Sequence, residues 1–241
     1  CESGSRGWGF ASPDSDYDVR FIYVNRLPWY LTVALGRDVI ELPISGDLDI
    51  NGWDLRKALG LMRESNPTLL EWLRSPIVYR EEAESMAGFR ALAEQVFSNA
   101  KGWHHYASMA KKNFREHLQA DEVRYKKYLY VLRPLLAARW IRNLPGVPPM
   151  RFAELAQHTL DATATADAAL IAEINALLAV KMRAGEAATS PRWPDIHAFI
   201  ETELARNAAE PATAVAPHFD TAALDALLHD TVLRFTHPTN H

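Results

Sequence analysis

The chain has one cysteine, Cys1, among its 241 residues, so it holds no intrachain disulfide framework and fits a reducing compartment. It also lacks any apolar run that approaches the length of a membrane span, and it lacks a charged segment followed by an apolar one at its start. We therefore expect a cytoplasmic protein that does not enter a membrane.

An excess of positive charge is absent too. Lys and Arg number 26 against 30 Asp and Glu, which gives a formal net charge of −4. Tight, sequence-blind binding of nucleic acid or of an anionic membrane needs a strongly basic protein, so the overall charge argues against both. No repeat of fixed period runs through the chain, which excludes a solenoid. The composition is that of an ordinary globular protein, 48% hydrophobic.

Residues 1–80 mix strand and helix patterns. Strands are predicted at residues 18–24, 29–34, 38–44 and 47–50, the second and third forming a hairpin around Gly36. Residues 54–67 change to helical spacing, with Asp54 as the N-cap and Pro67 at the end. Residues 67–79 then predict a second short helix or turn.

From about residue 81 the pattern is almost entirely helical. Candidate helices lie at residues 82–97, 100–119, 122–143, 151–160, 165–183, 192–207 and 220–234. Turn and breaker residues separate them. The sequence therefore predicts an α+β protein in which a small mixed-sheet head, residues 1–80, is followed by an α-helical bundle, residues 81–241.

Two carboxylates lie at the start of the first predicted strand. Strand alternation points Asp16 and Asp18 to one face and Tyr17 to the other, into the core of the head. Adjacent carboxylates repel, and a fold tolerates them readily when a cation lies between them. Mg²⁺ or Mn²⁺ takes such carboxylate oxygens together with phosphate oxygens. A third acid on a neighbouring strand would complete a two-metal site, and Asp49, between two apolar residues, is the first choice.

Several neighbouring charges leave alternatives open. Asp54 is the second candidate for the third acid, although it also fits the N-cap of a helix. Asp47 shares a strand face with Asp49 but lies at the opening of that strand. Asp14 fits a self-capping Asp-rich turn better than a metal site. Arg20 continues the face of the paired acids and either neutralises them or contacts phosphate.

A Gly-Ser pair precedes these acids. Gly4-Ser5 can form a tight turn whose backbone N–H groups and hydroxyl cradle phosphates. Gly-Ser, then Ser-Asp-Tyr-Asp at residues 15–18 before an apolar strand, then the acid at Asp49, resembles the DNA polymerase β type of nucleotidyltransferase. More narrowly, four segments look like a bacterial family of predicted nucleotidyltransferases that includes the YcgL-type proteins, some of them assigned to RNA repair. These segments, which cover about residues 1–150, are ESGSRGWGFASPDSDYDVRFIYV, DINGWDLRKAL, SNPTLLEWLRSPIVY and KKYLYVLRPLLAARW.

The resemblance implies Mg²⁺-dependent transfer of a nucleoside monophosphate from an NTP to a hydroxyl group, with release of pyrophosphate. The acceptor would be an RNA end, a protein or a small molecule. Asp16 and Asp18 would hold the metal ions, Asp49 would help to activate the acceptor, and Gly4-Ser5 would meet the pyrophosphate charge. Such heads have a helix and a strand ahead of Gly-Ser, so we expect an N-terminal element to be missing here.

Basic and aromatic residues interleave in RYKKYLYVLR, within the helix predicted at 122–143. Lys126 and Arg133 border a buried stripe that is predicted to comprise Leu129, Leu132, Leu136 and Trp140. Transferases of the polymerase β type commonly grip the NTP with a basic residue and an aromatic one from the helical domain. The resemblance therefore implies a phosphate clamp of Lys126 and Arg133, and the alternative is that both side chains extend to solvent.

The preceding predicted helix, 100–119, contributes one further candidate. Lys111 borders its core stripe and is a candidate for binding triphosphate or acceptor. His104 and His105 point to different faces of the helix, so they make no metal motif by themselves. The tryptophans at 53, 72, 103 and 140 are predicted to belong to the core.

Two other classes of function compete with an enzyme. One is a catalytically silent module that keeps the fold and senses nucleotide, and the other is a structural domain that needs no metal. The intact acids Asp16, Asp18 and Asp49 argue against both. A toxin–antitoxin component that modifies tRNA or a partner protein remains a variant of the enzymatic function.

Overall fold

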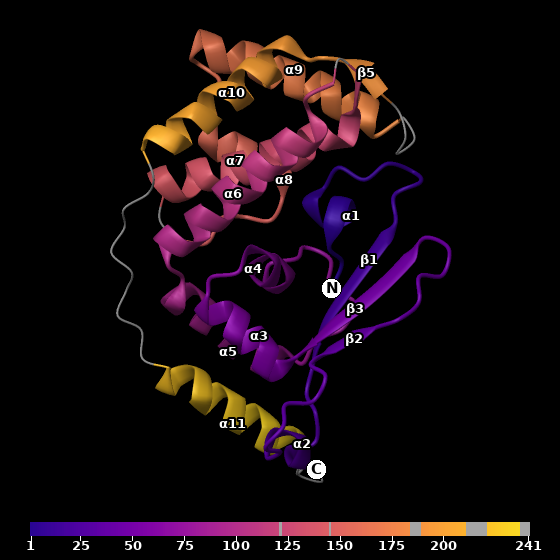
Figure 1. Ribbon diagram of the computed structural model, residues 1–241, viewed down its shortest axis with the longest axis vertical. Coiled ribbons are helices and arrows are strands. Elements are labelled where there is room, and N and C mark those ends of the chain that lie inside the picture. The colour runs from indigo at the N-terminus through magenta and orange to yellow at the C-terminus, as the bar shows by residue number, and fades with distance from the viewer. Residues whose placement is uncertain (121, 145, 184–188, 211–220, 237–241) are drawn as a thin grey trace.

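The computed structural model describes residues 1–120, 122–144, 146–183, 189–210 and 221–236. Within them a small mixed sheet stands at one side of the molecule and helices make up most of the rest (Figure 1), so the predicted α+β fold class is confirmed. In chain order the elements are α1 (Gly4–Trp8), β1 (Tyr17–Tyr23), α2 (Leu27–Tyr30), β2 (Val39–Glu41), β3 (Leu48–Asp54), α3 (Leu55–Arg63), α4 (Pro67–Leu73), α5 (Ala83–Val96), α6 (Asn99–His117), β4 (Glu122–Arg124), α7 (Tyr125–Asn143), α8 (Phe152–Thr159), α9 (Thr165–Lys181), β5 (Thr189–Pro191), α10 (Pro194–Ala209) and α11 (Ala222–Thr236).

The sheet of the head has the strand order β1–β3–β2, with β1 parallel and β2 antiparallel to β3. One face, which carries Ile22 and Trp53, packs against the hydrophobic core. The Trp53 ring stacks on Trp72 of α4 with 3.7 Å between the ring centroids. Tyr17 lies on the opposite face and is 45% exposed. The prediction that Tyr17 points into the core is therefore wrong, because the core lies on the other side of the sheet.

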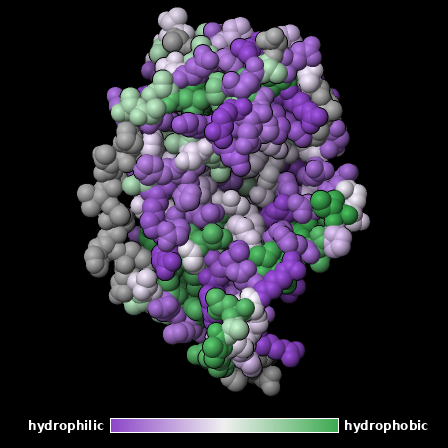
Figure 2. Space-filling model, viewed as in Figure 1, coloured by the Kyte–Doolittle hydropathy of each residue, from purple (hydrophilic) through white to green (hydrophobic). Residues whose placement is uncertain are grey.

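Residues 29–34 do not form the predicted strand. Pro28 stands in the first turn of α2, where its fixed φ suits a helix. The Tyr30 hydroxyl at the end of α2 donates to Asp54 Oδ2 at 2.7 Å, which ties this segment to β3. β2 instead forms the hairpin with β3. Figure 2 shows hydrophobic surface at the lower end of the molecule, near α2, where the exposed apolar side chains are Leu31, Val33 and Leu35.

The helices predicted from residue 81 onward are present, with shifted ends. The largest shift is at residue 122, because Glu122–Arg124 form β4, which pairs antiparallel with β5 before α7 begins. The predicted start of the last helix, residue 220, lies outside the described residues. None of the helices in the described ranges is long and apolar enough to cross a bilayer.

The long helix α7 forms the centre of the core. The stripe predicted for it is buried, but so are side chains on its other faces, including Val131, Leu135 and Ala138. α6 packs along α7, and α8, α9 and α10 also contact it. One contiguous set of buried side chains extends from Phe10 in the head to Val232 in α11. The proposed domain boundary at residue 80 stays a prediction, and both sides of it share this core.

Candidate active site at the start of β1 and β3

Asp18 and Asp49 face each other on two neighbouring strands. Each is the second residue of its strand, and the parallel register of β1 and β3 places them directly opposite. Strand alternation assigns both side chains to the sheet face that also carries Ile22 and Trp53. The structure thus brings together two acids that are 31 positions apart in the sequence, as the pattern of apolar residues around Asp49 predicts.

The Arg20 guanidinium joins these two acids. Its Nη2 lies 2.8 Å from Asp18 Oδ1 and 2.7 Å from Asp49 Oδ2, and its Nη1 donates to the Asp49 carbonyl at 2.9 Å. The Arg20 side chain is 15% exposed, against 27% for Asp18 and 37% for Asp49. Of the two roles that the sequence left open for Arg20, neutralisation of the acids is the one that this geometry shows.

Gly4 packs directly against the Asp18 carboxylate. It begins α1 with φ of 58°, in the left-handed region that favours glycine. A Cβ atom added at Gly4 would overlap with Asp18 Oδ2, so the close approach also requires glycine. Ser5 follows, 8% exposed, with its carbonyl accepting from Gly9 and Phe10. The predicted Gly-Ser turn is therefore the first turn of a short helix that begins at the Asp18 side chain.

Glu2 is a buried member of the site that sequence reasoning missed. It is 0% exposed, and its Oε1 accepts from the Asp18 N–H at 2.8 Å. Its Oε2 accepts from the Tyr79 hydroxyl, and burial together with this hydrogen bond raises the pKa of Tyr79 to about 12. The chain around Glu2 runs antiparallel to β1 through a bridge to Val19. That pairing could not be recognised from three residues of sequence.

The site carries more negative than positive charge. Burial raises the pKa of the Asp18 carboxyl above its ordinary value, and Arg20 opposes this by favouring the charged form. The carboxylates of Asp49, Glu2 and Asp16 raise the Asp18 pKa further, in that order. One guanidinium therefore faces several acids, and a group that brings more positive charge would be favoured beside Asp18.

The loop that delivers Asp16 is held from two sides. Arg6 in α1 donates to the carbonyls of Ser15 at 2.8 Å and Asp16 at 3.2 Å. The Ser12 and Ser15 hydroxyls lie 3.0 Å apart, and Lys181 at the end of α9 donates to Ser12 Oγ at 2.9 Å. Lys181 is 3% exposed. The late helix α9 thus contributes to the acid site, whereas the sequence resemblance was placed on residues 1–150.

The structure separates the candidates for the third acid. Asp54 caps α3 by accepting from the Arg56 N–H at 2.8 Å, and its other oxygen accepts from Asn25 and Tyr30. It is 0% exposed and five residues further along β3 than Asp49. Asp47 is exposed just ahead of β3, where its carbonyl accepts from the Tyr17 N–H. Asp49 is the one of the three that lies opposite Asp18.

The acids are of the type that binds a hard cation, but Arg20 occupies the position between two of them. Carboxylate oxygens on adjacent strands are ligands that Mg²⁺ and Mn²⁺ prefer. Within the described residues, no group of three or more His, Cys, Asp and Glu side chains is arranged as a metal site. The Arg20 guanidinium stands between Asp18 and Asp49, so it is the group that a bound ion would replace there.

The two cations predicted as a phosphate clamp lie in different surroundings. Lys126 is half-buried near the start of α7. Burial lowers the pKa of the neighbouring Lys127, and the charge of Lys126 lowers it further. Arg133 is 3% exposed and pairs with Glu71 Oε1 of α4 at 2.7 Å. Its guanidinium also lies 4.7 Å from the Trp8 ring centroid, at the end of α1. In this structure Arg133 is an interior ion-pair residue and not a surface residue facing the acids.

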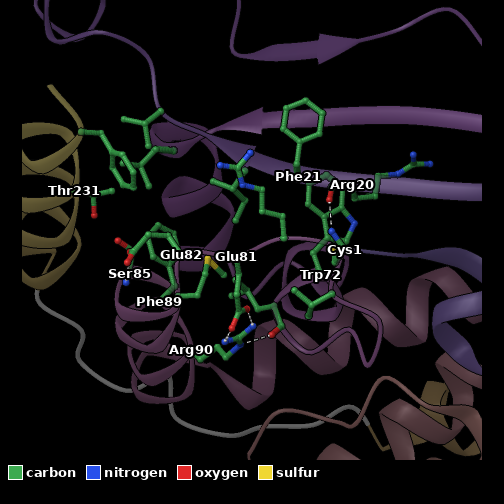
Figure 3. Close-up of a pocket in the computed structure, with 18 residues that line it drawn as sticks. Cys1, Arg20, Phe21, Trp72, Glu81, Glu82, Ser85, Phe89, Arg90 and Thr231 are labelled. Atoms are coloured by element: carbon green, nitrogen blue, oxygen red, sulfur yellow. Dashed lines mark hydrogen bonds and ion pairs between the residues drawn. The ribbon is translucent and has the colours of Figure 1, made fainter. Parts of the chain in front are cut away.

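A separate cavity of about 320 Å³ lies between the sheet, α4, α5 and α11. Figure 3 shows Trp72, Phe89 and Thr231 among its walls, and an Arg90–Glu81 ion pair at 2.6 Å on its rim. The Arg20 guanidinium extends along β1 away from this cavity (Figure 3). Asp16, Asp18 and Asp49 are not among the lining residues, although Arg20, which bridges two of them, is, so the cavity and the acids are neighbouring sites that share this residue.

Comparison with known proteins gives the chain a context. A sequence model of RlaP, described as the RNA repair pathway DNA polymerase beta family, matches residues 1–230. The resemblance therefore extends well past residue 150. An uncharacterized protein, YcgL of Bacillus subtilis (strain 168), is 48% identical over 205 residues, which cover 85% of this chain and 77% of the YcgL chain. No solved structure matches.

Proposed function

Because the chain belongs to the RNA repair pathway DNA polymerase beta family, we propose that it is a Mg²⁺-dependent nucleotidyltransferase. It transfers a nucleoside monophosphate from an NTP to a hydroxyl group and releases pyrophosphate. The observation that carries this proposal is the register of Asp18 against Asp49, with Gly4 packed on the Asp18 carboxylate. The family description names an RNA repair pathway, which favours an RNA end over a protein or a small molecule as the acceptor.

The metal would be held by Asp16, Asp18 and Asp49, and bound Mg²⁺ orients the triphosphate and lowers the pKa of the attacking hydroxyl. The excess of carboxylates around Asp18 supports this role, because an ion offers the charge that Arg20 alone does not balance. Arg20 would leave its bridging position when the ion binds. When the ion is absent, Arg20 neutralises the acids.

The remaining roles belong to the chain itself. Gly4 and Ser5 place the first turn of α1 beside the acids, where backbone N–H groups meet the departing pyrophosphate. Lys126 contributes positive charge for the NTP. Arg133 acts indirectly, because its contacts with Glu71 and the Trp8 ring hold the end of α1 in place.

The first test is calorimetric binding of each NTP with and without Mg²⁺. We expect Mg²⁺-dependent binding in the wild type and its loss in Asp16→Asn/Asp18→Asn. Asp47→Asn is the matched control, since it removes an exposed charge at the same end of the sheet. Binding that is independent of Mg²⁺, or unchanged in the double variant, contradicts the assignment of the acids.

A second measurement separates an enzyme from a silent nucleotide sensor. Pyrophosphate release is followed with the NTP that binds, in the presence of an RNA oligonucleotide with a free terminal hydroxyl. Release that depends on both the RNA and Asp18 supports the transferase. Mg²⁺-dependent NTP binding with no release from RNA, protein or small-molecule acceptors would favour the sensor.

A further inference from the structure

A groove with a volume of about 460 Å³ lies between α6 and α10, on the helical part of the molecule. The two helices contact each other, and Figure 1 shows α10 next to the α6–α7 pair. Its walls come from one side of α6 and from the last turns of α10. None of the residues of the acid site or of the cavity in Figure 3 lines it, so it is a distinct site.

The polar side chains of this groove favour an anion. Its lining residues include Lys111, Arg115 and His104, and no Asp or Glu is among the described lining residues. Lys111 and Arg115 lie one helical turn apart on α6, and neither forms an ion pair within the described part of the chain. Two unbalanced cations on one wall therefore attract negative charge.

Two side-chain nitrogens of the groove wall are shielded from solvent and have no hydrogen-bond partner among the described residues. Trp103 is 3% exposed and Asn207 is 9% exposed, and both residues line the groove. Within the part of the chain that the structure describes, Trp103 Nε1 and Asn207 Nδ2 make no hydrogen bond, although Asn207 Oδ1 accepts from Arg142 at 2.9 Å. A buried donor without a partner is unfavourable, so such groups are normally satisfied by water or by a ligand.

Apolar and aromatic surface completes the walls. Phe114 and Leu204 line the groove beside Trp103. The His104 ring contacts the Trp103 ring edge-on, with 5.0 Å between centroids. Sites for small ligands are commonly of this size, with mostly apolar walls and a few placed polar groups.

We propose that this groove binds a nucleoside phosphate. The phosphate lies against Lys111 and Arg115, the base packs on the aromatic wall, and its acceptor atoms take the unused N–H groups of Trp103 and Asn207 once these side chains turn towards the groove. The same chemistry is offered by a free mononucleotide and by the terminal nucleotide of an RNA strand. The site goes beyond the proposed transfer reaction and does not depend on the carboxylates of the head.

The test measures AMP binding by calorimetry in EDTA, using the Asp16→Asn/Asp18→Asn protein so that the acid site is silent. We expect saturable binding that is tighter than that of inorganic phosphate. Lys111→Ala/Arg115→Ala should weaken it at least about tenfold, because both charge-assisted contacts to the phosphate are lost. Lys112→Ala, an exposed lysine on α6 that does not line the groove, should leave the affinity unchanged.

A second pair of variants tests the buried donors. Trp103→Phe keeps an aromatic ring and removes the N–H, so AMP affinity should fall several-fold. Trp140→Phe is the matched control, because Trp140 Nε1 is also buried without a partner but lies outside the groove. Far-UV circular dichroism and the urea midpoint show whether each variant is folded.

Three outcomes would overturn the proposal: no AMP binding in EDTA, AMP binding no tighter than phosphate, or equal losses in the variants and their controls. A short RNA with a terminal phosphate is titrated in parallel. Tighter binding of the RNA than of AMP identifies a strand end as the ligand, and the reverse identifies a free mononucleotide. Both results support the site, and neither depends on whether the transferase reaction takes place.

Discussion

Two clusters of charge in this molecule use arginine in opposite ways. In the interior, Arg133 and Glu71 form a one-to-one pair whose side chains are 3% and 8% exposed. Glu71 Oε2 also accepts from Trp8 Nε1 at 3.0 Å, and Arg133 Nε donates to the Met150 carbonyl at 3.3 Å. Charge and hydrogen bonds are balanced there, as a buried ion pair requires.

At the edge of the sheet, Arg20 faces two acids with one nitrogen and is outnumbered by carboxylates. Burial raises the pKa of Asp18 and the neighbouring carboxylates raise it further, which is unfavourable for the folded protein at neutral pH. Such an excess costs stability, and the proposed cation would relieve it. The comparison teaches that the two clusters differ in their balance of charge and not in their residue types.

The largest expected effect is on the interior pair. Glu71→Ala leaves the Arg133 guanidinium buried without its partner, and it should lower the free energy of unfolding by about 3–5 kcal/mol. The measurement is urea denaturation followed by circular dichroism. Glu94→Ala is the control, since the Arg74–Glu94 pair is 36% and 44% exposed and should be worth less than about 1 kcal/mol. Equal losses in the two variants would contradict the distinction between buried and exposed pairs.

An intermediate effect is expected where the helical turn meets the acids. Gly4→Ala introduces a side chain at positive φ and into the Asp18 carboxylate, so it should cost more than about 2 kcal/mol and abolish NTP binding. Gly46→Ala has nearly the same φ, 59°, but open space around the new Cβ. It should cost about 1 kcal/mol and leave NTP binding intact. If the two variants behave alike, the contact between Gly4 and Asp18 is not what shapes the site.

Much of this arrangement could be predicted from local sequence patterns. Alternation placed Asp18 at a strand start, and the apolar neighbours of Asp49 placed it on an adjacent strand, whereas Asp16 lies exposed in the loop just ahead of β1. Asp54 was correctly predicted as a helix cap, because N-capping depends on the few residues that follow it. These features depend on short segments, and local chemistry decides them.

The features that sequence reasoning missed depend on distant partners. The burial of Arg133 follows from Glu71, 62 positions earlier, and the anchoring of Ser12 follows from Lys181, 169 positions later. A charged residue at the border of a buried helical stripe has the same sequence pattern whether its side chain extends to solvent or pairs with a buried partner. The strand predicted at 29–34 failed for a related reason, since its apolar alternation did not reveal that Pro28 begins a helix there.

The smallest expected effect is a change in how stability depends on pH, caused by Asp18. Because the folded protein raises the Asp18 pKa above 3.8, protonated Asp18 favours folding, and this contribution is lost as pH rises through the raised value. Asp18→Asn removes that titration. Its unfolding free energy relative to wild type should therefore rise from about pH 4 towards neutrality in metal-free buffer, even though NTP binding is lost.

Glu81→Gln should change the pH dependence of stability in the opposite direction to Asp18→Asn. The hydrogen bond from Arg90 lowers the pKa of Glu81 below 4.5, so the ionised carboxylate stabilises the fold above that pH. The Gln variant should lose stability relative to wild type as pH rises, where the Asn variant at position 18 gains it. Urea midpoints of the three proteins across the same pH series measure both slopes. Parallel slopes in the two variants would mean that neither the burial of Asp18 nor the acids around it carries a free-energy cost, and the argument for a cation at that site would lose its electrostatic support.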